Sequence, residues 1–170
     1  MKAVISIFII LLTIKGIGQV PAEMVDAVKK LQFLEGVWKG QGWILSGDSK
    51  QFFNETETAT IKTGGTLLQI DVFGTDVDND QKIINNGLAL VRYDTTKNAY
   101  EMDFYQSDGS RATATVNLLK TNIAEIILSR AGSFTKFVIE IRNKRWFEQA
   151  FSSPDGKNWT QFFEMDLRLQ

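Results

Sequence analysis

The chain has 170 residues, of which 44% are hydrophobic and 11% aromatic, so one domain with a sizeable packed core is expected. Its formal net charge of -1 gives no electrostatic reason to expect nucleic acid or an anionic membrane surface as a partner. The absence of cysteine and histidine excludes disulfides, thiolate nucleophiles, Cys–His zinc sites, Ser–His–Asp triads and histidine-ligated haem.

Residues 1–19 have the composition of a signal peptide. Lys2 precedes an almost unbroken apolar run from Ala3 to Ile14, and small residues follow it up to Gln19. The alternative, a transmembrane anchor, is disfavoured because that run is shorter than the roughly 20 residues needed to span a bilayer. We therefore predict a secreted or periplasmic domain of residues 20–170 that begins near Gln19 and has no stable membrane anchor.

The first element of this domain is predicted to be a short helix over Ala22–Gln32. Its apolar residues Met24, Val25, Val28 and Leu31 recur at helical spacing, and its charged residues lie off that stripe. We expect the helix to pack as a cap on the mouth of the domain, because a helix that binds a membrane surface would need a more basic polar face.

From Gly36 onward the sequence is typical of strands and turns. Segments with apolar and polar alternation are separated by short stretches rich in Gly, Asn and Asp, which accept positive φ. The predicted strands are Gly36–Leu45, Gln51–Thr63, Thr66–Thr75, Ile83–Asp94, Ala99–Gln106, Ser110–Leu119, Ile123–Arg130, Phe134–Arg142, Arg145–Ser152 and Trp159–Leu169.

Connections this short force neighbouring strands to pair antiparallel, and no crossover helix is present that would allow a parallel sheet. An open sheet of this size would leave two unpaired edges, which closure removes. The expected fold is therefore all-β: an antiparallel up-and-down β-barrel of about ten strands with a short N-terminal capping helix.

Three stretches support this expectation by their order along the chain. They are Phe33–Gly42, which contains the Gly-x-Trp of Gly36 and Trp38, then Gly87–Asp94, then Phe151–Trp159. Together they resemble a calycin-like (lipocalin or nitrobindin-like) secreted bacterial family of unknown function. The resemblance implies a barrel whose floor is closed by the tryptophan. Nitrobindin-like proteins hold haem through a histidine, which this chain lacks, so no cofactor is expected.

The resemblance favours non-enzymatic binding of a small hydrophobic or amphipathic molecule in the lumen, the space that the strands enclose. Two alternatives remain open: a small-molecule enzyme that uses a lumen carboxylate and an arginine, and an interaction module with a filled barrel that forms a homodimer. A strongly shifted carboxylate deep in the lumen would favour the enzyme, and a lumen packed solid would favour the interaction module.

Candidate ligand-binding residues are aromatic, sulfur-containing or charged side chains within strands, because such groups give broad apolar contact and a few orienting polar groups. They are Phe73, Arg92, Tyr100, Met102, Phe104, Trp146, Glu148 and Met165. No catalytic residue and no metal ligand are assigned.

The resemblance also implies a structural latch. In lipocalins an arginine late in the chain packs across the tryptophan of the first strand. Gly36, Trp38 and Arg168 occupy the corresponding places here, because Arg168 lies near the end of the last predicted strand. We expect the Arg168 guanidinium to lie over the Trp38 ring as a cation–π contact.

Overall fold

The fold is described from a computed structural model, in which residues 20–130 and 132–170 are placed. The predicted signal peptide lies outside these residues. Among the residues described, no helix is long and apolar enough to cross a membrane.

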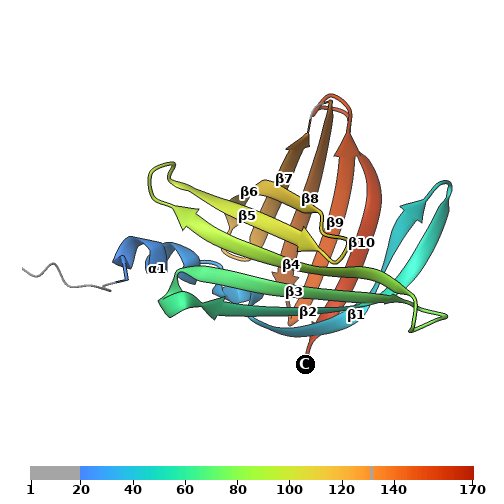
Figure 1. Cartoon of the computed structure of the whole chain (residues 1–170), viewed down its shortest axis with the longest axis horizontal. Helices are drawn as coiled ribbons and strands as arrows, with labels where there is room; N and C mark the ends of the chain where they lie inside the picture. Colours follow the sequence, from blue (N-terminus) through green and yellow to red (C-terminus); the bar gives the residue numbers. More distant parts are fainter. Residues whose placement is uncertain (1–19, 131) are drawn as a thin grey trace, which may run out of the picture.

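Ten antiparallel strands form one closed barrel with one short α-helix before them (Figure 1). This confirms the predicted fold class. The elements are α1 (Ala22–Lys29), η1 (Gln32–Leu34), β1 (Gly36–Ser46), β2 (Ser49–Lys62), η2 (Thr63–Gly65), β3 (Leu67–Asp76), β4 (Ile83–Asp94), β5 (Ala99–Gln106), β6 (Arg111–Lys120), β7 (Ile123–Arg130), β8 (Ser133–Arg142), β9 (Arg145–Ser153) and β10 (Thr160–Leu169).

Consecutive strands are neighbours all the way round, and β1 pairs with β10 to close the barrel. The turns follow from local sequence. Between β8 and β9, for example, Asn143 and Lys144 have φ of 53° and 59°, so both central residues of a two-residue hairpin are left-handed. Such hairpins match the twist of the flanking strands, so each strand pairs with the next along the chain.

The N-terminal helix is shorter than predicted. The α-helix ends at Lys29, and a 3₁₀ turn of Gln32–Leu34 follows it. Val28 and Leu31 have no exposed surface, and Leu34 is also buried. Burial of these three side chains against the barrel stabilises the chain more than one further turn of regular α-helix would. The intrinsic stability of so short a helix is too small to extend it.

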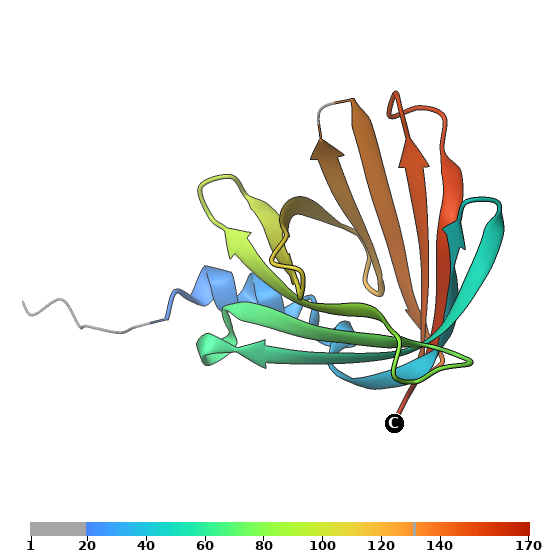
Figure 2. The same ribbon diagram turned by 45° about the vertical axis from the view of Figure 1, so that its right-hand side comes forward.

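The helix closes one end of the barrel. It packs against β4 and η2, and both views show it lying against the same end of the strands (Figures 1 and 2). Inside that end, the Tyr100 hydroxyl donates a hydrogen bond of 2.7 Å to the Ala27 carbonyl. The helix is therefore tied to the barrel by a buried polar contact as well as by apolar packing.

Candidate functional site

A cavity of about 700 Å³ occupies the lumen. Most of its wall is apolar and comes from the inward faces of the strands, as with Ile70, Met102 and Ile126. Its outer rim includes polar residues at the start of β4, at the end of β5 and in the turn that follows, among them Asn85, Gln106 and Asp108. The cavity thus lies towards the end of the barrel opposite α1, and its volume is that of a site for one small molecule.

Two tryptophans pack together in the lumen, and one of them, Trp146, lines this space. Trp38 and Trp146 are almost fully buried, and their rings meet edge to face with centroids 5.8 Å apart. The Trp38 indole N–H donates a hydrogen bond of 2.8 Å to the Leu34 carbonyl, which links Trp38 to the 3₁₀ turn. Trp38 is thus buried between Trp146 and the 3₁₀ turn, and its expected role in closing the floor stays a prediction.

Three buried carboxyl groups line the cavity, and we call them the lumen carboxyls: Glu55 and Glu57 on β2 and Glu148 on β9. Their residues are 3%, 6% and 8% exposed. Period-2 alternation accounts for their direction, because Glu55 and Glu57 share a face of β2 with the buried Phe53 and Ala59.

The Glu55 carboxyl group is enclosed by protein. Both of its carboxyl oxygens are buried, and neither has a hydrogen-bond partner among the residues described. In the sheet it lies opposite Gly40 on β1 and Gly74 on β3, so neither neighbouring strand places a side chain beside it. A Cβ at position 74 would lie only 2.4 Å from Glu55 Oε2, so Gly74 provides the room for this carboxyl group.

Burial raises the pKa of every lumen carboxyl. Desolvation, with a smaller repulsion from Glu148, raises the pKa of Glu55 to about 8. Desolvation also raises the pKa of Glu148 to about 7, opposed by a 2.9 Å hydrogen bond that the Trp146 indole N–H donates to Glu148 Oε2. The pKa of Glu57 is raised well above its usual range by desolvation and by repulsion from Glu148, Glu55 and Asp71.

No lysine or arginine is among the described residues that line the cavity. The same described residues contain no group of three or more His, Cys, Asp or Glu side chains arranged to hold a metal ion, so the lumen carboxyls do not form one. Within that part of the chain the cavity therefore combines a large apolar wall with acidic groups and has no basic side chain to neutralise them.

Most of the sequence-predicted binding residues lie on the inward face. Met102, Phe104, Trp146, Glu148 and Met165 line the cavity. Tyr100 shares their side of the barrel but lies deeper, where its hydroxyl is bonded to the helix. Whether these side chains contact a ligand stays a prediction.

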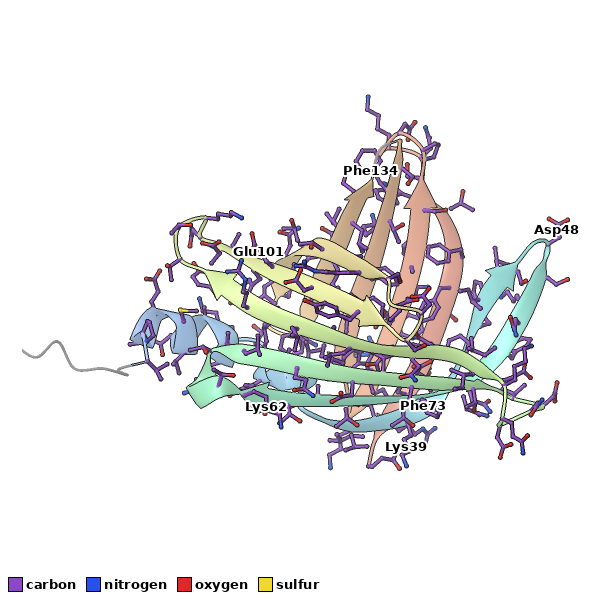
Figure 3. The ribbon with its side chains drawn as sticks, in the orientation of Figure 1. Lys39, Asp48, Lys62, Phe73, Glu101 and Phe134 are labelled. Carbon is purple, nitrogen blue, oxygen red and sulfur yellow. The ribbon has the colours of Figure 1, made fainter. Side chains whose placement is uncertain are left out.

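Two of the predicted binding residues lie on the outer surface instead. Phe73, labelled in Figure 3, is 47% exposed on β3, since its neighbours Val72 and Gly74 face inward. Arg92 faces outward from β4, where it forms ion pairs with Glu101 and, at 3.7 Å, with Asp94. Neither side chain lines the cavity, so the prediction that Phe73 and Arg92 belong to the binding site is wrong.

The predicted latch is also corrected. Trp38 faces the lumen, whereas Arg168 is exposed on the outer face of β10, one residue after the fully buried Leu167. Adjacent residues of a strand point to opposite faces, so the Arg168 side chain is directed away from the Trp38 ring. Gly36 is tightly packed at this seam, because a Cβ there would lie 2.4 Å from Leu169 Cδ1.

Glu55 and Glu57 were missed as site residues, although a signal for them was present. In Phe53–Ile61 every second residue shares a face, and that face begins with a phenylalanine and ends with alanine and isoleucine. Apolar residues at both ends of the face indicate that it is buried, so the two glutamates between them also point inward.

No protein-family model and no curated protein matches the chain. Among solved structures it is similar to Rv2717c from M. tuberculosis, with a TM-score of 0.62 and 13% identity over 85% of this chain and 97% of that one. It is also similar to the S-type phycobiliprotein lyase CPES from Guillardia theta, with a TM-score of 0.59 and 6% identity over 90% and 98% of the two chains.

At these identities the similarity concerns the fold. Together with the closed ten-stranded barrel, it fits a calycin-like fold. The function of this protein has to be argued from the lumen itself.

Proposed function

We propose that this protein binds one small, largely apolar or amphipathic molecule in the lumen of its barrel, without transforming it. The observation that carries this proposal is the cavity of about 700 Å³, which holds Glu55, a buried carboxyl group with no hydrogen-bond partner among the described residues. A buried polar group without a partner destabilises a fold, so its presence is explained by a ligand that supplies the missing contact.

We further propose that the protein acts outside the cytoplasm. The support is the N-terminal sequence, in which a lysine, an apolar run and small residues follow one another in the order of a signal peptide. Sequencing the N-terminus of the exported protein tests this proposal. A chain that begins near Gln19 supports it, and a chain that retains Met1 to Ile14 in a membrane fraction contradicts it.

A second candidate, catalysis by the lumen carboxyls, is favoured by one observation. Glu55 and Glu148 have pKa values of about 8 and 7, so a protonated carboxyl group is available near neutral pH as a general acid. The expected arginine partner is absent from this site, because Arg92 is ion-paired on the outer surface. Recovery of a chemically altered molecule after incubation with the protein would favour catalysis over binding.

The third function considered, an interaction module with a filled barrel, requires a packed lumen. The cavity of about 700 Å³ does not meet that requirement. The proposal is therefore a binding protein that accommodates its ligand inside the barrel.

Fluorescence titration with N-phenyl-1-naphthylamine, a neutral apolar probe, tests lumen binding at pH 6, where the carboxyl groups are mostly protonated. We expect saturable binding with one site per chain. Ala112→Trp should abolish it because Ala112 lines the cavity, whereas Thr113→Trp, on the exposed face of the same strand, should leave it unchanged. Absence of binding by the folded protein, or equal loss in both variants, would overturn the proposal.

A further inference from the structure

The lumen carboxyls indicate which polar group would suit a molecule bound in this cavity. Their charges lie on two well-separated segments of the chain, yet all three residues line the same cavity. A purely apolar occupant would leave the Glu55 oxygens without partners, and an anionic occupant would add repulsion to the burial of three acidic groups.

We propose that the molecule bound in the lumen carries a protonated nitrogen, an alkylammonium or amidinium group, that is seated against the Glu55 carboxylate, with Glu57 and Glu148 adding negative potential around it. This inference rests on the proposed function and names the chemical class of the ligand. An N–H donor satisfies the unpartnered oxygens of Glu55, and its charge offsets the desolvation of the carboxylate.

Glu55 lines the cavity, so a group of the bound molecule approaches it from the lumen. The residues directly opposite it on β1 and β3 are both glycines, Gly40 and Gly74, so neither of these two positions places a side chain against the carboxyl group. Trp146 already donates its N–H to one oxygen of Glu148 and so orients that carboxyl group. Glu55 thus supplies the acceptor and Glu148 a fixed negative group on the far side of β1 and β10.

Other charged groups do not compete for this position. The cavity-lining residues of β3 to β8 are uncharged, including the polar Asn85, Gln106 and Thr135, and Tyr93 and Tyr100 pack together near the helix. At the rim, Asp108 is the acidic lining residue. The carboxyl groups that share the cavity with Glu55 are therefore Glu57 on its own strand, Glu148 on β9 and Asp108 at the mouth.

Binding of a cation is then coupled to release of a proton. In the empty barrel Glu55 is mostly protonated below pH 8. An alkylammonium, with a pKa near the 10.4 of lysine, keeps its own proton, so the carboxyl group must lose its proton to solvent when the pair forms. Affinity for the cation should rise with pH, by up to about tenfold per unit below the pKa of the carboxyl group.

A matched set of three fluorescent probes tests this inference: 2-(1-naphthyl)ethylamine, 2-(1-naphthyl)ethanol and 1-naphthylacetate. At pH 8 we expect the amine to bind at least about tenfold more tightly than the alcohol, and the carboxylate to bind least. Between pH 6 and pH 8 the affinity for the amine should rise about tenfold or more, whereas that for the alcohol should change less than about threefold.

Glu55→Gln keeps the shape of the side chain but removes its charge. We expect this variant to lose the preference for the amine and its pH dependence while still binding the alcohol. Glu140→Gln is the control, because Glu140 lies on the outer face of β8 beside Arg142; its binding should equal that of the original protein.

The failure of this inference and that of the proposed function give different results. Equal affinity for amine and alcohol, tighter binding of the carboxylate, or an amine preference that survives in Glu55→Gln would overturn the inference while lumen binding stands. Failure of all three probes and of the neutral apolar probe to bind the folded protein would overturn the proposed function itself.

Discussion

At position 74 the absence of a side chain makes room for the Glu55 carboxyl group. A Cβ there would lie 2.4 Å from Glu55 Oε2, closer than any ordinary contact. We expect Gly74→Ala to lower the free energy of unfolding by about 1–3 kcal/mol, the usual effect of overpacking. Urea denaturation measures this change.

A double-mutant cycle tests the cause of that loss. In a Glu55→Ala background the obstructing carboxyl group is gone, so Gly74→Ala should cost much less than in the original chain. An equal cost in both backgrounds would mean that strain in β3, and not contact with Glu55, is responsible.

The indole N–H of Trp146 controls the protonation of its neighbour. Its hydrogen bond to Glu148 Oε2 opposes the desolvation that raises the pKa of that carboxyl group. Trp146→Phe removes the donor, so we expect the pKa of Glu148 to rise further above about 7. Carbon-13 NMR titration of the glutamate carboxyl groups measures it. Trp43→Phe is a matched control on the outer face, where Trp43 lies beside Lys50. If Trp43→Phe raised the pKa of Glu148 as much as Trp146→Phe does, the Trp146 hydrogen bond would not be the cause.

Among the elements, β3 and β4 show why the site was only partly predictable. Period-2 alternation divides each strand into two faces but does not say which is inward. In β4 the outward face carries Leu88 and Leu90 and the inward face Ala89 and Val91, so both faces are apolar and Arg92 could be assigned to either.

In β3 the prediction of Phe73 as an inward residue relied on its aromatic character, although the composition of the two strand faces was the more informative pattern. Its face also carries Gln69 and Asp71, whereas Ile70 and Val72 occupy the other face and are buried. The same comparison of faces over β2 identifies Glu55 and Glu57 as inward. The polar residues of the site were therefore obtainable from patterns of whole strands, but not from the character of single residues.

The attachment of α1 to the barrel depends on Tyr100. Its hydroxyl donates to the Ala27 carbonyl, which also accepts the backbone N–H of Lys30. Because that carbonyl keeps one partner, Tyr100→Phe should cost only about 1 kcal/mol of global stability. Amide hydrogen exchange in α1 should nevertheless accelerate, because the helix loses its buried polar link.

Tyr105→Phe controls for the loss of a hydroxyl, since Tyr105 lies in the same strand and is 39% exposed. Faster exchange in α1 after Tyr105→Phe, or unchanged exchange after Tyr100→Phe, would contradict this role of the hydrogen bond.

For the whole molecule, stability should fall as the pH rises from 5 to 8. In the folded chain the pKa values of Glu55 and Glu148 are raised to about 8 and 7, whereas in the unfolded chain a glutamate has its ordinary pKa of 4.5. In this window the folded state binds more protons, so raising the pH favours unfolding, by up to about 1.4 kcal/mol per unit for each such group. The surface carboxylate Asp76 affects stability at lower pH, outside this window, because its pKa is lowered to about 2.

Urea denaturation at a series of pH values measures this slope. Glu55→Gln should reduce it, because glutamine binds no proton in either state, and Glu140→Gln should not. A stability that rises from pH 5 to pH 8 would contradict the raised pKa values of the lumen carboxyls.

The closed barrel itself could be predicted from the sequence because it depends on many weak signals that agree. Short turns such as Asn143–Lys144 set antiparallel neighbours, and the pairing of β1 with β10 follows once every edge must be satisfied. The empty volume could not be predicted, since it depends on how inward side chains from ten strands meet, and no pattern within one strand records that.

The barrel has an open end and an end filled by α1, Val28 and Leu31. A bound molecule must therefore leave through the open end by which it entered, and a second molecule cannot enter from the closed end to displace it. Exchange has to pass through an empty barrel, so in a stopped-flow chase the rate of release should be the same at every concentration of the competing molecule.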